Sequence, residues 1–229
     1  MAPHKGGPPR REAVRVKTAG KRKSSSTQWL QRQLNDPYVS EAKRLGYRSR
    51  AAFKLIELDN RFHFLKSGAR VVDLGAAPGG WTQIAVQRVG ALKGKGLVVG
   101  VDILATPPIP GATLLHADFT DPATPDAIKA ALGGKADLVL SDMAAPAMGH
   151  QQTDHARIVA LAETAYDFAV EILAPRGSFV CKVFQGGAEG ELLRRLKHDF
   201  AELRHAKPPA SRSESAEVYL VAQGFRAPT

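Results

Sequence analysis

The chain has 229 residues, a length that suits one α/β domain with a sizeable core better than two domains. Hydrophobic residues make up 44% of it, yet no run approaches the roughly 20 apolar residues of a membrane helix, and no apolar secretory signal opens the sequence. The single cysteine, Cys181, cannot form an internal disulfide and lies in an apolar run, as a core residue does. We therefore expect a cytoplasmic protein without membrane contact.

Positive charge is concentrated before residue 71. Residues 1–70 hold 17 Lys and Arg against 5 Asp and Glu, whereas residues 71–229 hold 15 against 17. Such a concentration indicates a surface that binds a polyanion, although a solvated tail or a mitochondrial targeting peptide has a similar composition. The Pro and Gly residues of positions 1–10 argue against the amphipathic helix of a targeting peptide.

The N-terminal region divides into an extension and a set of short helices. Residues 1–26 are rich in Lys, Arg, Gly, Pro and Ser without hydrophobic periodicity, so we predict a disordered extension before a single domain over residues 27–229. The domain begins with three predicted helices, which lie from Trp29 to about Asp36, over about Ser40–Leu45 and from near Ser49.

The rest of the chain alternates between apolar strand-like runs and helical patterns. This alternation predicts a Rossmann-like α/β fold, with a mostly parallel seven-stranded sheet and helices on both faces. The predicted strands are Val71–Leu74, Leu97–Val101, Ala112–His116, Ala136–Ser141, Ser178–Val183, a weaker Phe200–Arg204 and Glu217–Ala222, and the predicted helices are Gly80–Arg88, Thr124–Leu132, Asp154–Leu173 and Glu189–Lys197.

A turn of small residues follows the first strand. The segment reads VVDLGAAPGGW, in which Trp81 opens the next helix, and such a strand–turn–helix junction lets a ligand approach the backbone closely. Its glycines, at 75, 79 and 80, do not match the G-x-G-x-x-G of dinucleotide sites, so a nicotinamide oxidoreductase is disfavoured. The segment resembles motif I of S-adenosylmethionine (AdoMet) methyltransferases.

Two carboxylates follow the next strands. Asp102 ends the second predicted strand and can accept both hydroxyls of a ribose, and Asp118 follows the third and can accept from an adenine amino group. Phe119, next to Asp118, is expected to pack on the adenine ring. Ligands of open α/β sheets bind at the carboxyl ends of strands, where these residues fall.

Several further motifs occur in order along the chain, and together with VVDLGAAPGGW they resemble the FtsJ/RrmJ family of AdoMet-dependent ribosomal RNA 2′-O-ribose methyltransferases. The resemblance covers about residues 27–224. It departs from the family after Met143, where the chain reads AAPA instead of the frequent Ala-Pro-Asn, and in its longer basic extension. The motifs are Leu34–Val39, Arg48–Leu55, Ser141–Ala144, Gly177–Gly186 and Ser211–Tyr219.

The resemblance implies a substrate and a set of site residues. Bacterial members methylate a uridine ribose in the A loop of 23S rRNA on the large ribosomal subunit, and we expect the same partner, a monomer and no metal. Alternatives are a 2′-O-methyltransferase acting on tRNA or mitochondrial rRNA, and a non-catalytic ribosome-assembly factor that binds RNA. The implied catalytic tetrad is Lys54, Asp142, Lys182 and Glu217, and the implied AdoMet-binding residues are Gly79, Trp81, Asp102, Asp118 and Asp142.

The chemistry of ribose methylation is consistent with these residue types. A ribose hydroxyl needs in-line positioning and removal of its proton, and a lysine removes a proton when burial or a neighbouring cation lowers its pKa. Lys182 lies in an apolar strand and is our candidate base, with Lys54 and Asp142 tuning and positioning it and Glu217 holding a lysine or the ribose. A lysine that reaches solvent is the alternative for both Lys54 and Lys182.

RNA capture is assigned to the basic region. Arg and Lys side chains there can neutralise phosphates, and nearby aromatic rings can stack on bases. For Trp29 and Tyr38, the alternative is that the rings anchor the N-terminal helices to the core. The basic candidates are Arg32, Lys43, Arg44, Arg48 and Arg50, and the aromatic candidates are Trp29, Tyr38 and Tyr47.

Overall fold

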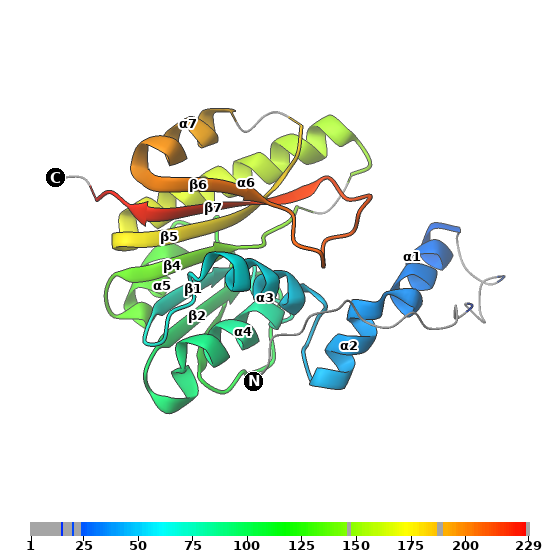
Figure 1. Cartoon of the computed structure of the whole chain (residues 1–229), viewed down its shortest axis with the longest axis horizontal. Helices are drawn as coiled ribbons and strands as arrows, with labels where there is room; N and C mark the ends of the chain where they lie inside the picture. The colour runs from blue at the N-terminus through cyan, green and yellow to red at the C-terminus, as the bar shows by residue number, and fades with distance from the viewer. Residues whose placement is uncertain (1–14, 16–19, 21–23, 146–147, 187–189, 228–229) are drawn as a thin grey trace.

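The computed structural model describes residues 15, 20, 24–145, 148–186 and 190–227. At its centre lies a seven-stranded sheet in the order β3-β2-β1-β4-β5-β7-β6 (Figure 1). The strands from β3 to β5 pair in parallel, whereas β7 runs antiparallel to both of its neighbours. The strands are β1 Arg70–Leu74, β2 Leu97–Asp102, β3 Ala112–His116, β4 Ala136–Ser141, β5 Leu173–Phe184, β6 Phe200–Ala206 and β7 Glu217–Phe225.

Helices cover both faces of the sheet and form two cores. Val71 of β1 belongs to the core that includes α3 and α4, and the next residue, Val72, to the core that includes α5, α6 and α7, because successive side chains of a strand point to opposite faces. The Rossmann-like architecture is therefore confirmed. None of the helices in the described part of the chain is long and apolar enough to cross a membrane. The helices are α1 Ser24–Asn35, α2 Pro37–Leu45, α3 Ala51–Phe62, α4 Gly80–Val89, α5 Thr124–Leu132, α6 Gln151–Ile172 and α7 Gly190–Asp199.

The largest difference from the predicted strands is at β5, which begins at Leu173 and not at Ser178. Pro175 and Gly177 give this segment the composition of a turn, and Leu173 fits the apolar period of the preceding helix. In the sheet, a register shift opposite Ala136 and Leu138 of β4 accommodates the extra residues. Pairing with β4, which no local pattern shows, decides where the strand begins.

Helices α1 and α2 lie to one side of the sheet, with α1 farthest from it, whereas α3 packs on the sheet (Figure 1). Helix α2 begins three residues before its predicted start because Asp36 accepts a hydrogen bond from the backbone N–H of Tyr38 at 3.0 Å and Pro37 occupies the first turn. Helix α1 begins at Ser24, inside the segment predicted as an extension. The rest of the predicted extension, residues 1–23, lies outside the described residues except for residues 15 and 20.

Candidate active site

The small-residue turn joins β1 to α4 and is closely packed. Gly75 has a φ of +81° and Gly79, the residue before α4, a φ of +109°, conformations that favour glycine. A Cβ on Gly79 would lie 2.6 Å from Cδ1 of Ile109, and one on Gly75 would lie 2.9 Å from Cγ of Met143. Side chains are therefore excluded at both positions, which leaves backbone groups to line this edge of the sheet.

Trp81 contributes to this turn through its backbone. Its indole is buried, its Nε1 donates to the carbonyl of Ala51 at 2.8 Å, and its ring lies 5.5 Å from that of Tyr219. The side chain thus fastens α4 to α3. The backbone N–H of Trp81 lies in the first turn of α4, where helices leave N–H groups without intrahelical partners.

Asp102 and Asp118 lie where the sequence predicts, at the carboxyl ends of neighbouring strands. Asp102 accepts the N–H of Ala77 at 2.9 Å, which ties it to the small-residue turn, and it borders a small cavity of about 80 Å³. Asp118 is exposed, and hydrogen bonds from Thr120 lower the pKa of its carboxyl. The two carboxylates therefore lie at the same edge as the turn.

Phe119 packs mainly in the core, and its contact with an adenine ring stays a prediction. The ring is buried in the core beside α6, where it packs edge-on against Phe168 with the ring centres 5.3 Å apart. Asp118 is exposed, so adjacent residues here point in opposite directions. Phe119 therefore stabilises the packing of α6 and leaves only a small part of its surface exposed.

Lys182 and Asp142 form the first of two lysine–carboxylate pairs. Asp142 follows the last residue of β4, and Lys182 lies in the neighbouring strand β5. The Nζ of Lys182 is 3.0 Å from Oδ1 of Asp142 and donates to its backbone carbonyl at 2.8 Å. The Lys182 residue is only 7% exposed, so the alternative of a lysine reaching into solvent is excluded.

Lys54 and Glu217 form the second pair. Lys54 projects from α3 over the sheet, and its Nζ is 2.6 Å from Oε1 of Glu217, the first residue of β7. The hydroxyl of Ser211 donates to the same oxygen at 2.9 Å. Glu217 therefore holds Lys54 and not Lys182, a choice that the sequence left open.

Tyr219 joins the two pairs and was missed by the sequence analysis. Its hydroxyl donates to Oδ1 of Asp142 at 2.9 Å, and the Nζ of Lys54 lies 5.8 Å from the centre of its ring. Burial, with the negative charges of Asp142 and Glu217, raises its pKa, so the phenol stays protonated and can donate. The signal was its position two residues after Glu217, which places both on one face of a strand.

A buried carboxylate, Asp73, lies behind this group in β1 and was also missed. It accepts a hydrogen bond from the Thr82 hydroxyl at 2.6 Å, and its other oxygen, Oδ1, has no hydrogen-bond partner. Burial, reinforced by the charges of Asp142 and Asp102, raises its pKa to about 7. The sequence offers an acidic residue in an apolar strand as the only signal.

The structure changes the roles of two of the basic candidates. Arg48 donates to the carbonyls of Pro78, Pro107 and Pro108, so it ties the small-residue turn to the loop after β2. Arg50 pairs with buried Asp36 at 2.8 Å. Both guanidinium groups therefore have partners within the protein, and their contact with phosphates stays a prediction. Arg32, Lys43 and Arg44 are exposed, with Arg44 paired to Glu41.

The aromatic candidates with described side chains serve packing. Tyr38 and Tyr47 both pack on Phe53 of α3, with ring centres 5.3 and 5.7 Å apart. The Tyr38 hydroxyl also donates to Glu57 at 3.2 Å. The anchoring alternative is thus confirmed for Tyr38, and Tyr47 packs in the same way. The side chain of Trp29 lies outside the described residues.

The residues at this edge fit an AdoMet molecule by their chemistry. Carboxylates suit ribose hydroxyls and the positive charges of the sulfonium and ammonium groups, and Asp102 and Asp142 both lie beside the small-residue turn. Among the described residues, no group of His, Cys, Asp and Glu could hold a metal ion. Pro146 and Ala147, half of the unusual AAPA segment, lie outside them.

Comparisons with known proteins identify the chain as similar to methyltransferases. The model of the FtsJ-like methyltransferase family matches residues 47–225. The ribosomal RNA large subunit methyltransferase E of Paramagnetospirillum magneticum is 66% identical over 96% of this chain and 91% of its own length. The protein of the same name from Rhodospirillum rubrum is also 66% identical, over 93% of this chain and 81% of its own.

Solved structures show the same fold. A Plasmodium falciparum protein described as a ribosomal RNA methyltransferase superposes with a TM-score of 0.70 at 30% identity, over 80% of this chain and all of its own. A protein from Clostridium thermocellum described as an rRNA methylase reaches a TM-score of 0.51 at 16% identity, over 74% of this chain and 97% of its own, which is a likeness of fold alone.

Proposed function

The chain belongs to the FtsJ-like methyltransferase family, and on this premise we propose that it transfers a methyl group from AdoMet to the 2′-oxygen of a ribose in ribosomal RNA. The names of its relatives support the large ribosomal subunit as the substrate particle. The acceptor that we propose is a uridine in the A loop of 23S rRNA. The observation that carries the proposal is the pairing of buried Lys182 with Asp142 beside the small-residue turn.

Lys182 accepts the proton of the ribose hydroxyl in this proposal. When bound, AdoMet would supply an electrophilic methyl group, whose bond to sulfur breaks as its bond to the ribose oxygen forms. Lys182 acts here as the neutral amine and takes up the hydroxyl proton on the lone pair of Nζ, becoming the ammonium. Two oxygens of Asp142 lie 3.0 and 2.8 Å from Nζ and can accept its two N–H groups, which leaves the lone pair for the hydroxyl. General-base catalysis of this kind raises the reaction rate by about 10²–10⁴-fold.

Lys54 and Glu217 position the acceptor. Their charges neutralise each other across 2.6 Å, and Tyr219 connects them to Asp142. A ribose placed between the two pairs would meet donors and acceptors on both sides. Holding reactants in line contributes up to ~7–11 kcal/mol to catalysis, so small displacements here are costly.

The proposed AdoMet contacts follow the carboxyl ends of the strands. Backbone groups of Gly79 and Trp81 would hold the amino-acid part, Asp102 the ribose hydroxyls, Asp118 the adenine amino group, and Asp142 the side nearest the methyl donor. The support is that all five residues lie at one edge of the sheet. Arg48 braces this region by joining the loops on either side of it.

RNA would approach over the N-terminal helices. The exposed Arg32, Lys43 and Arg44 lie on α1 and α2, which extend beyond the sheet (Figure 1). Phosphate contacts by such residues make binding steeply dependent on salt. We place the enzyme in the cytoplasm, where large subunits are assembled, acting as a monomer.

The test is methyl transfer in vitro with competing acceptors. Purified protein and radiolabelled AdoMet are mixed with free rRNA, large subunits and tRNA from a strain that lacks the enzyme, and the labelled ribose is mapped. We expect label in 23S rRNA of large subunits. Label in tRNA would favour tRNA as the acceptor, and the same assay with mitochondrial rRNA added tests the other alternative. AdoMet binding without transfer to any RNA would favour the non-catalytic assembly factor.

A further inference from the structure

Ser211 lies behind the second pair, in the loop between β6 and β7. Its hydroxyl and the Nζ of Lys54 both meet Oε1 of Glu217, at 2.9 and 2.6 Å. Ser211 is 7% exposed and Glu217 is 9% exposed, so water has little access to compete for that oxygen. A fixed second donor on Oε1 limits rotation of the carboxylate and so directs it at Lys54.

The backbone of Ala210, next to Ser211, is held by Glu57 of α3 and by Arg50, which directly precedes α3. The N–H of Ala210 donates to Oε2 of Glu57 at 2.7 Å, and the carbonyl of Ala210 accepts from the guanidinium of Arg50. Ala210 itself is fully buried against Phe53. Both polar groups of one peptide residue are thus fixed by the N-terminal helical region, immediately before the serine.

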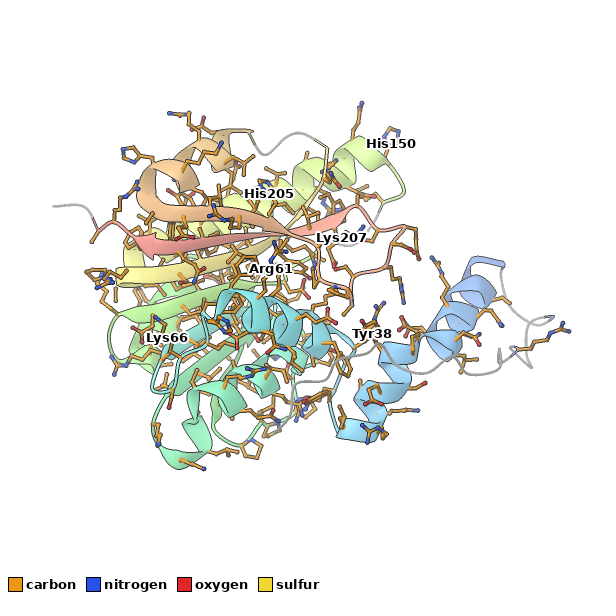
Figure 2. The ribbon with its side chains drawn as sticks, in the orientation of Figure 1. Tyr38, Arg61, Lys66, His150, His205 and Lys207 are labelled. Atoms are coloured by element: carbon orange, nitrogen blue, oxygen red, sulfur yellow. The ribbon has the colours of Figure 1, made fainter. Side chains whose placement is uncertain are left out.

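The residue after Ser211 is held as well. Arg212 lies 3.4 Å from the carboxylate of Asp36, which also pairs with Arg50 and caps α2. We call Asp36, Arg50 and Glu57, with Ala210 and Arg212, the clasp. Lys207, at the start of the same loop, donates to two carbonyls farther along it and lies on the same side of the molecule as Tyr38 (Figure 2).

We propose that Ser211 is a positioning residue for methyl transfer, which orients Glu217 and through it Lys54, and that the clasp holds Ser211 in place for this task. Connecting loops are usually more mobile than the strands that they join. Here, however, Ser211 is held from both of its neighbours, and its hydroxyl is used on a carboxylate of the tetrad. The inference rests on the proposed function.

The experiment compares three variants of the full chain. Ser211→Ala removes the donor, Ser211→Thr keeps a hydroxyl, and Ser213→Ala, at an exposed position of the same loop, is the matched control. On the acceptor that the wild type methylates, we expect Ser211→Ala to lower kcat roughly tenfold, as loss of one hydrogen bond to a charged group does. KM for both substrates and the dissociation constant for AdoMet should not change. Ser211→Thr should recover most of kcat, and Ser213→Ala should match the wild type.

A second comparison separates positioning from general stability. In a Glu217→Ala background, Ser211→Ala should lower kcat less than about twofold further, because nothing remains for the serine to orient. If Ser211→Ala does not fold, Ser211→Cys, a weaker donor of similar size, should lower kcat several-fold at an unchanged melting temperature. The inference would be overturned if Ser211→Ala, or Ser211→Cys where Ser211→Ala does not fold, kept a kcat within twofold of the wild type. It would also be overturned if Ser211→Ala caused its full loss of kcat again in the Glu217→Ala background. A wild type without transferase activity would instead overturn the proposed function.

Discussion

The two lysine–carboxylate pairs use the same chemical groups at similar distances but are built differently. Lys182 lies in β5, and Asp142 directly follows the neighbouring parallel strand β4 at the centre of the sheet. Lys54 and Glu217 join a helix to the first residue of an antiparallel strand, across the boundary between two layers. The first pair is therefore fixed by backbone pairing, and the second depends on how a helix and a loop pack.

This difference is consistent with different roles for the two pairs, proton transfer for the first and positioning of the acceptor for the second. A general base requires a fixed place relative to the reacting atoms, which a central sheet provides. The second pair lies next to the N-terminal helices, where RNA would arrive, and in our proposal the clasp holds it in position through Ser211. The comparison predicts a large loss of activity when the first pair is changed and smaller losses for the second.

Removal of the proposed base should have the largest effect. Lys182→Ala is expected to lower kcat by about 10²–10⁴-fold because the proton of the ribose hydroxyl loses its acceptor. AdoMet binding, measured by calorimetry, should remain. Lys197→Ala, at an exposed position of α7, is the control. Near-normal transfer by Lys182→Ala would remove the first pair from the mechanism.

Disruption of the second pair should cost less. Lys54→Ala and Glu217→Ala are each expected to lower kcat by roughly 10–100-fold through misplacement of the acceptor. The double variant should be little worse than either single one, because the two groups act together across 2.6 Å. Single-turnover kinetics at saturating RNA would measure this, and additive losses would show that the two residues act separately.

Loss of the connection between the pairs should have a moderate effect. Tyr219→Phe removes one hydrogen bond to Asp142 and keeps the ring that packs on Trp81. We expect kcat to fall about 3–10-fold, the value of one buried hydrogen bond, with little change in melting temperature. An unchanged kcat would mean that the two pairs work independently.

The smallest expected effect concerns pH and the carboxylate behind the first pair. Burial raises the pKa of Asp73 to about 7 from an ordinary value of 3.8, so the folded protein binds more protons there than the unfolded chain. Its contribution to stability is therefore lost as pH rises between about 4 and 7. Asp73→Asn keeps an acceptor for Thr82 and removes the titration.

Thermal melting between pH 5 and 8 tests this. The wild type should lose stability relative to Asp73→Asn as the pH rises, by a few degrees in melting temperature, whereas Asp73→Asn should lack that component. If the melting temperatures of the two proteins changed with pH in parallel, Asp73 would not titrate in this range.

Most of the fold could be predicted from the sequence because its signals are local. Buried strands such as Ala136–Ser141 are continuous apolar runs, and the glycines at 75 and 79 are required by the turn's own backbone. The start of β5 was predicted wrongly because pairing with β4 decides it. The packing of Phe119 on α6 could not be predicted, because single-sequence patterns do not show toward which core a residue after a strand turns.

The candidate site divides in the same way. The sequence by itself determined the alternation of strands and helices, and its ordered motifs gave the resemblance that implies the tetrad, since motif order and hydrophobic pattern are properties of the chain. Only the tertiary structure decided that Asp142 holds Lys182 while Glu217 holds Lys54, that Tyr219 lies between them, and that Arg48 and Arg50 bind their own protein. The physical reason is that ion pairs and buried hydrogen bonds depend on distances between segments far apart in sequence, and these exist only once the layers have packed.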